Sequence, residues 1–207
     1  MSTAAAISVA EPRLPAGIPD VPVWKMSVEQ YESLLSNGIL KDGDAIELLD
    51  GWLVPKMTKY PPHTVCVGLL TDALSAVLPS GWHLRNQEPV TLARSVPEPD
   101  LAVVTGIRRD YKDRHPVADE IAVLVEVADA TLEQDRGLKL RVYAESGIRE
   151  YWLVDLASEC ITVLTEPNRT IANPRFDKIQ VYRRADSIPL PEMLAPNEMI
   201  PVADLLP

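Results

Sequence analysis

The segment "IAVLVEVADA", residues 121–130, is the most apolar and most β-branched run of the chain. Residues of this kind favour the interior of a β-sheet, so the segment predicts a central strand. Glu126 lies inside it, and burial of an unpaired carboxylate is costly. We therefore expect Glu126 to be protonated, paired with a cation or bound to a metal. Strand alternation places it on the face of Leu124 and Ala128, near the carboxyl end of the strand.

Patterns on either side of this strand predict a mixed sheet with helices. Apolar spacing with capping and stop signals predicts helices at residues 27–38, 62–78 and 131–147. Short β-type runs predict strands at residues 82–87, 89–93, 99–104, 149–155, 160–165 and 178–184. The pair Asp50-Gly51 predicts a hairpin turn. A strand, helix and strand between residues 121 and 155 imply a parallel pair, whereas the hairpin is antiparallel. The fold class is therefore α/β or α+β, with a mixed central sheet flanked by helices.

The length of 207 residues, 46% of them hydrophobic, is enough for one domain with a sizeable core. Residues 1–22 are rich in Ala and Pro and have no periodicity, so they predict a flexible N-terminal arm. Residues 23–207 are expected to form a single domain. Its Pro-rich segment, from about residue 186, is expected to wrap the surface.

Composition narrows the function classes. The net charge of −10 and a pI of about 4.8 argue against broad, non-specific attraction to nucleic acid. No apolar run approaches the roughly 20 residues of a membrane span, so no membrane association is expected. Two cysteines and no signal-peptide pattern predict a cytoplasmic protein. A histidine-rich or thiolate metal site is not expected, because the three histidines lie far apart and no CxxC pair occurs.

Asp100 is a candidate partner for Glu126. It opens an apolar strand after two prolines that stiffen its approach. If the two strands are neighbours, both carboxylates converge on one point. Paired carboxylates suit Mg²⁺ or Mn²⁺, because hard cations prefer oxygen ligands.

Lys139 lies in the apolar stripe of the third expected helix. At about 100° per residue, Leu132 lies about 20° and Tyr143 about 40° from it on the helical wheel. Lys139 therefore faces the sheet and needs a carboxylate, which Glu126 supplies. Asp135, one turn earlier, is a candidate brace for Lys139 through an i,i+4 pair. An alternative interpretation is that these charged residues form a buried ion network with a structural role alone.

The stretches "PEPDLAVV", "VLVEVADAT" and "DRGLKLRVYAESGIREYWLVD" resemble a restriction endonuclease domain family, formerly catalogued as a domain of unknown function. The family belongs to the PD-(D/E)XK nuclease superfamily. The resemblance covers residues 27 to 184, roughly, and includes "IELLDGWLV" and "PPHTV". It implies a restriction-endonuclease-like core and Mg²⁺- or Mn²⁺-dependent hydrolysis of DNA, with Asp100 and Glu126 as metal ligands.

The chain departs from the superfamily pattern at one position. The superfamily has Glu-x-Lys on its second strand, but Ala128 stands where that lysine would be. Resemblance to this family implies that the lysine has moved to the following helix, as Lys139. It also implies that Glu47 is an earlier acidic residue of the catalytic set and that His63 and Gln87 line the site.

Three questions stay open at this level. The basic segments 106–116 and 56–60 are candidates for DNA contact, or are solvated loops. A homodimer would let two sites cut two strands, but no residue pattern proves it. A catalytically silent nucleic-acid-binding protein with the nuclease fold, and a non-enzymatic interaction domain, are the alternatives to an endonuclease.

Overall fold

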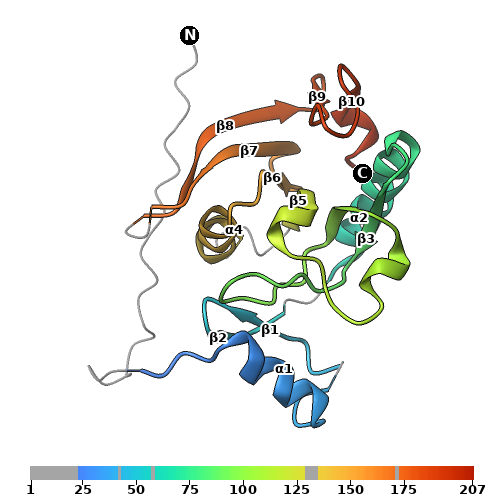
Figure 1. The fold of residues 1–207 in the computed structure, drawn as a ribbon. Coiled ribbons are helices and arrows are strands. Elements are labelled where there is room, and N and C mark those ends of the chain that lie inside the picture. The colour runs from blue at the N-terminus through green and yellow to red at the C-terminus, as the bar shows by residue number, and fades with distance from the viewer. Residues whose placement is uncertain (1–22, 42, 57–58, 129–134, 171–172) are drawn as a thin grey trace.

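A six-stranded mixed sheet forms the centre of the computed structural model, which describes residues 23–41, 43–56, 59–128, 135–170 and 173–207 (Figure 1). Its strand order is β3-β4-β5-β6-β7-β8. The strands are β3 Trp82–Asn86, β4 Leu101–Thr105, β5 Ile121–Ala128, β6 Glu150–Asp155, β7 Cys160–Asn168 and β8 Arg175–Arg183. β5 and β6 pair in parallel, and the other neighbours in this sheet pair antiparallel. The predicted mixed sheet is confirmed.

β5 occupies an inner position of the sheet, and all eight of its residues are buried. Val125 and Val127 belong to a core shared with α2, Pro61–Val77, whereas Leu124 and Ala128 belong to a core shared with α4, Leu140–Ser146. Figure 1 shows the two helices on opposite sides of the sheet. Because both faces are covered, the strand is apolar apart from Glu126.

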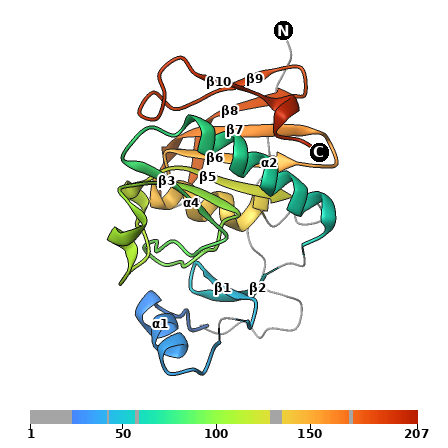
Figure 2. The ribbon, with the colours of Figure 1, turned by 90° about the vertical axis from the view of Figure 1, so that its right-hand side faces the viewer.

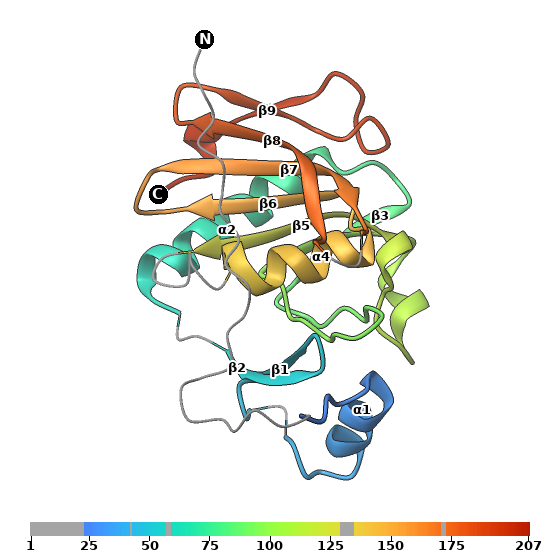
Figure 3. The same cartoon turned by 90° about the vertical axis from the view of Figure 1, so that its left-hand side faces the viewer.

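The segment between β5 and β6 crosses the α4 face of the sheet (Figure 3). A π-helical turn, Asp135–Lys139, leads directly into α4. α4 ends at Gly147, whose φ of +76° is left-handed, as in a common C-terminal cap. The expected helix is present from residue 135 onward, and its proposed capping box lies outside the described residues. The sequence pattern contained no signal for the π turn.

A small module precedes the sheet. It contains α1, Val28–Ser36, and the hairpin of β1, Ile46–Leu49, and β2, Trp52–Pro55. The predicted capping box of α1 is present, and both residues of the Asp50-Gly51 turn have positive φ, as expected. The hairpin forms its own two-stranded sheet and lies beside the central sheet (Figure 2).

The strand predicted at residues 89–93 is wrong. This segment makes isolated bridges only, Thr91 with Val117 and Leu92 with Ser95. The backbone of Val90 donates to Pro97 O and that of Leu92 to Ser95 O, so the segment turns back on itself. Together with the bond from the Thr91 N–H to Pro116 O, these bonds satisfy backbone groups of the segment without a full partner strand.

The Pro-rich end is more than a surface wrap, which corrects the expectation. It contains β9, Ser187–Pro189, and β10, Met199–Pro201, which pair antiparallel, followed by a short 3₁₀ turn, Val202–Asp204. Apolar side chains of this end are buried in the core beside α2: Ile188, Leu190, Leu194, Ile200, Val202, Leu205 and Leu206. Among the described residues, no helix has the length and hydropathy needed to cross a membrane.

Candidate functional site

Asp100 and Glu126 lie opposite each other on neighbouring strands. Leu101 pairs with Val125, so Asp100, one residue before β4, faces Glu126 on β5. Oδ2 of Asp100 accepts the backbone N–H of Val127 at 2.9 Å, which holds this carboxylate against β5. The two residues are 7% and 4% exposed. The structure therefore places the two predicted carboxylates on facing residues of neighbouring strands.

Two side chains hold the Asp100 carboxylate. Nε2 of His63, in the first turn of α2, lies 3.1 Å from Oδ2, and Nε2 of Gln87 donates to Oδ1 at 3.1 Å. Burial raises the pKa of Asp100, but hydrogen bonds from His63, Val127 and Gln87 outweigh burial, so the pKa lies below its ordinary value. Asp100 is therefore a carboxylate at neutral pH, as a ligand of a hard cation must be.

Gln87 reaches Asp100 through both its backbone and its side chain. It follows β3 in a left-handed conformation with φ +52°, which is uncommon for a residue other than glycine. Its backbone N–H donates to Asp100 O at 3.0 Å. The same residue thus fixes the chain and the carboxylate of Asp100.

Glu126 accepts two hydrogen bonds on one oxygen. Lys139 Nζ lies 2.9 Å from Oε1, and the hydroxyl of Tyr143 donates to the same atom at 2.6 Å. Lys139 and Tyr143 are four residues apart on one helical segment, so their side chains share the face that meets β5. The inward orientation predicted for Lys139 is present. The side chain of Asp135, its predicted brace, lies outside the described residues.

Glu47 reaches the same lysine from the separate hairpin. It lies in β1 and is 3% exposed, and its Oε1 is 3.5 Å from Lys139 Nζ. Its Oε2 accepts the backbone N–H of Glu98 at 3.1 Å. Lys139 is itself 7% exposed, and two neighbouring carboxylates offset the cost of burying its charge.

Glu98 connects the hairpin to the segment before Asp100. Its backbone N–H donates to Glu47, and its half-buried side chain pairs with Lys56. Leu48 O accepts the backbone N–H of Val96 at 2.8 Å, which brings the hairpin against this segment. The contact explains how an element outside the central sheet contributes to the site.

Two members of the site were missed by the sequence interpretation. Tyr143 is fully buried, and burial, followed by the charge of Glu126, raises the pKa of its hydroxyl well above the ordinary value. It remains a hydrogen-bond donor. Its place on the Lys139 stripe was a usable signal, because a buried tyrosine hydroxyl usually has a partner. The second missed member is the backbone N–H of Val127, which donates to Asp100. Every residue except proline has such a group, so the residue type gives no indication of this contact.

The donor set fits a hard divalent cation in part. Among the residues that the structure describes, no group of three or more His, Cys, Asp or Glu side chains is arranged to hold an ion. Mg²⁺, however, is commonly bound through one or two carboxylates together with water and substrate phosphates. Asp100 and Glu126 supply such a pair of oxygen donors.

The two basic segments are largely engaged within the protein. Arg114 pairs with Glu120, and Lys112 pairs with Asp113. Arg108 donates to Leu84 O, and Lys56 is the partner of Glu98. Among the described residues of these segments, Arg114, Lys112 and Lys56 thus each have a carboxylate partner.

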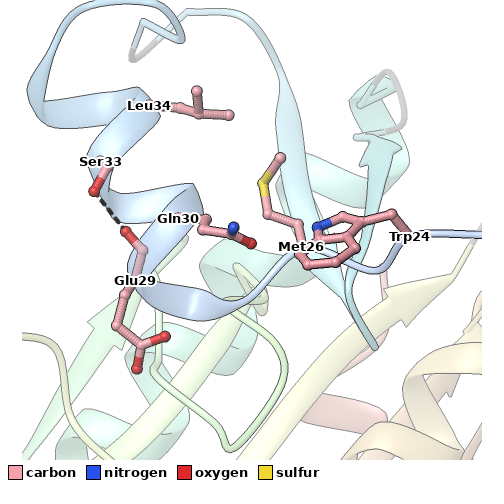
Figure 4. A pocket seen from close by; sticks show the side chains of 6 residues that line it. All are labelled: Trp24, Met26, Glu29, Gln30, Ser33 and Leu34. Carbon is pink, nitrogen blue, oxygen red and sulfur yellow. Dashed lines mark hydrogen bonds between the residues drawn. The ribbon is translucent and has the colours of Figure 1, made fainter.

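A pocket of about 420 Å³ lies against α1 (Figure 4). It is lined by Trp24, Met26, Glu29, Gln30, Ser33 and Leu34. Trp24 is 81% exposed. The pocket shares no residue with the candidate site.

Comparisons with known proteins agree with this geometry. A crystal structure of a putative nuclease belonging to DUF820 from Anabaena variabilis is similar, with a TM-score of 0.67 and 13% identity over 87% of this chain and 97% of that one. At this identity the likeness shows the fold. A search of curated proteins finds no match. The Uma2 family model, described as "Putative restriction endonuclease", matches residues 28–207. This confirms the family resemblance seen in the sequence and supports a nuclease with a nucleic-acid substrate. The chain belongs to the Uma2 family of restriction-endonuclease-like proteins.

Proposed function

We propose that the protein is a Mg²⁺- or Mn²⁺-dependent endonuclease that hydrolyses phosphodiester bonds in DNA. The observation that carries this proposal is the arrangement of Asp100 and Glu126 on neighbouring strands, with Lys139 bound to Glu126. A structural ion pair of Glu126 and Lys139 does not account for the second carboxylate, Asp100, which is buried and bound by His63, Gln87 and the Val127 N–H. Family membership supports the nuclease activity.

Each charged residue has a distinct role in this proposal. Asp100 and Glu126 would hold the divalent ion. A bound ion would polarise the phosphate and make an attacking water more acidic. Lys139 supplies a fixed positive charge for the negative charge that develops on the phosphate oxygens. Its preorganised contact with Glu126 means that little reorganisation is needed during the reaction.

The remaining residues hold these groups in place. Glu47 lies within ion-pair distance of Lys139 and balances its charge. His63 and Gln87 orient Asp100 from two different elements. Asp135 stays a predicted brace of the lysine.

Partners and location belong to the same proposal. DNA is the proposed substrate because of the restriction endonuclease description of the family. A homodimer would allow two sites to act on the two strands of a duplex. The proposed location is the cytoplasm, because a chain with two cysteines, both buried, suits a reducing compartment.

Incubation of the purified protein with supercoiled plasmid tests the proposal. We expect Mg²⁺ or Mn²⁺ to produce nicked or linear plasmid, and a chelator to prevent it. Asp100→Asn, Glu126→Gln and Lys139→Met should each lower the rate about 100-fold or more, as loss of a transition-state contact does elsewhere. Equal cleavage by wild type and all three variants would overturn the assignment. Plasmid binding that persists in chelator, without cleavage, would favour the silent nucleic-acid-binding alternative. A parallel incubation with single-stranded RNA shows whether the protein cleaves DNA or RNA.

A further inference from the structure

Two donors converge on a single oxygen of Glu126. The Tyr143 hydroxyl lies 2.6 Å and Lys139 Nζ 2.9 Å from Oε1. Hydrogen bonds are directional, so two donors on one oxygen restrict the rotation of the carboxylate more than one donor does. The orientation of Glu126 is therefore set from the helical side of the sheet.

The two donors differ in how firmly they are held. Tyr143 is fully buried, and its ring packs edge-on against Tyr151 of β6, with ring centroids 5.0 Å apart and an interplanar angle of 70°. Its hydroxyl position follows from core packing. Lys139, in contrast, has a flexible four-carbon stem and lies within reach of two carboxylates, those of Glu126 and Glu47.

Lys139 is therefore shared between two carboxylates, whereas the Tyr143 hydroxyl donates to Glu126 from a position set by packing. We infer that Tyr143 is a positioning residue that holds Glu126 in the orientation required for binding the divalent ion. This inference rests on the proposed function, since it concerns the same ion. Groups that orient metal ligands typically change metal affinity or activity by about 10- to 100-fold when they are removed.

Tyr143→Phe is the matched variant, because it removes the hydroxyl and retains the ring that packs on Tyr151. Tyr111→Phe is the control. The Tyr111 hydroxyl donates to Thr105 O at 2.9 Å, and its ring lies beside His83 of β3. Both variants lose one hydrogen-bonded hydroxyl, but of the two tyrosines only Tyr143 contacts a proposed ion ligand.

Calorimetric titration of the full-length protein with Mn²⁺ alone gives the first readout. We expect Tyr143→Phe to bind Mn²⁺ about 10- to 100-fold more weakly than wild type, and Tyr111→Phe to bind it like wild type. Plasmid cleavage over a range of Mg²⁺ concentrations gives the second. Here Tyr143→Phe should raise the Mg²⁺ concentration at half-maximal rate, with a much smaller change in rate at saturating Mg²⁺.

The outcomes separate this inference from the function on which it rests. Wild-type affinity for Mn²⁺ in Tyr143→Phe, with Glu126→Gln weakened, overturns the inference and leaves the proposed site intact. Equal weakening in both tyrosine variants also overturns it, because general destabilisation then explains the effect. A wild type that binds no Mn²⁺ and cleaves nothing overturns the proposed function and the inference together.

Discussion

Lys139 and Glu126, thirteen residues apart in the sequence, meet at 2.9 Å in the interior of the protein. The strand delivers the carboxylate to the α4 face of the sheet, and the π turn before α4 presents the ammonium to the same face. Ala128 stands two residues after Glu126 on the strand, so the ammonium that meets Glu126 comes from the helical segment instead.

Removal of the lysine should destabilise the fold as well as the activity. Lys139→Met leaves Glu47 and Glu126 without their shared cation, and loss of one partner of a buried pair costs about 3–5 kcal/mol. Urea unfolding measures the change. Adding Glu126→Gln to Lys139→Met should recover part of the loss, because one of the two uncompensated charges is then gone. Strictly additive destabilisation in the double variant would contradict the coupling of the two side chains.

A divalent ion should stabilise the protein if Asp100 and Glu126 form its site. Mg²⁺ at about 100 times its dissociation constant should add about 2.7 kcal/mol to the free energy of unfolding. A thermal melt with and without Mg²⁺ measures the shift, with Ca²⁺-free buffer and matched ionic strength. Asp100→Asn and Glu126→Gln should lose the shift. An unchanged melting temperature in wild type would favour an interaction domain whose buried charges serve packing.

Glu150 should make stability depend on pH. Burial raises its pKa to about 7, against the smaller lowering effects of the Trp152 hydrogen bond and Lys178. The pKa in the folded state therefore exceeds that of the unfolded state, so the stability present below about pH 4.5 is lost as the pH rises through about 7. The loss is about 3 kcal/mol across this window.

Urea unfolding at several pH values between 5 and 8 checks this, with buried Trp152 as the fluorescent probe. Trp152 Nε1 donates to Glu150 Oε1 at 2.6 Å, and a glutamine oxygen can accept the same bond. Glu150→Gln should therefore flatten the pH profile. An exposed control, Glu159→Gln, should leave it unchanged. The idea fails if the Glu150 variant retains the wild-type slope.

Two glycine-to-alanine substitutions should have opposite effects on the stability of the fold. Gly147 has φ +76°, and a Cβ there would collide with the Arg169 guanidinium, so Gly147→Ala should destabilise by about 1–2 kcal/mol. Gly68 lies inside α2 with open space around its Cβ position, so Gly68→Ala should stabilise by about 0.5–1 kcal/mol. Thermal melts of both variants measure the two changes in stability. A gain in stability at Gly147 would show that the left-handed cap is unimportant.

Much of the fold was predictable from local pattern. The central strand, the capping box at Ser27 and the Asp50-Gly51 turn each depend on neighbouring residues, so the sequence contains their whole signal. The inward face of Lys139 was also predictable, because helical geometry is fixed. The strand expected at residues 89–93 failed because its backbone groups bond to loop residues, Ser95, Pro97 and Pro116, rather than to a neighbouring strand.

The composition of the site needed the folded chain. Glu47 had no pattern that separated a buried carboxylate from a solvated one, since its burial depends on how the hairpin packs against the segment around Val96. His63 and Gln87 were implied by resemblance, but their common contact with Asp100 joins α2 and the end of β3. No spacing in the sequence encodes such a meeting.

The sequence by itself determined that a carboxylate stands in a buried strand and that a lysine on the next helix faces it, because both follow from the periods of strand and helix. Only the tertiary structure decided that Tyr143 shares the Glu126 oxygen, that Glu47 reaches Lys139 from a separate hairpin and that Val127 holds Asp100. These contacts depend on how elements pack at ångström distances. Periodicity specifies which face a residue occupies, but packing specifies which atoms meet there.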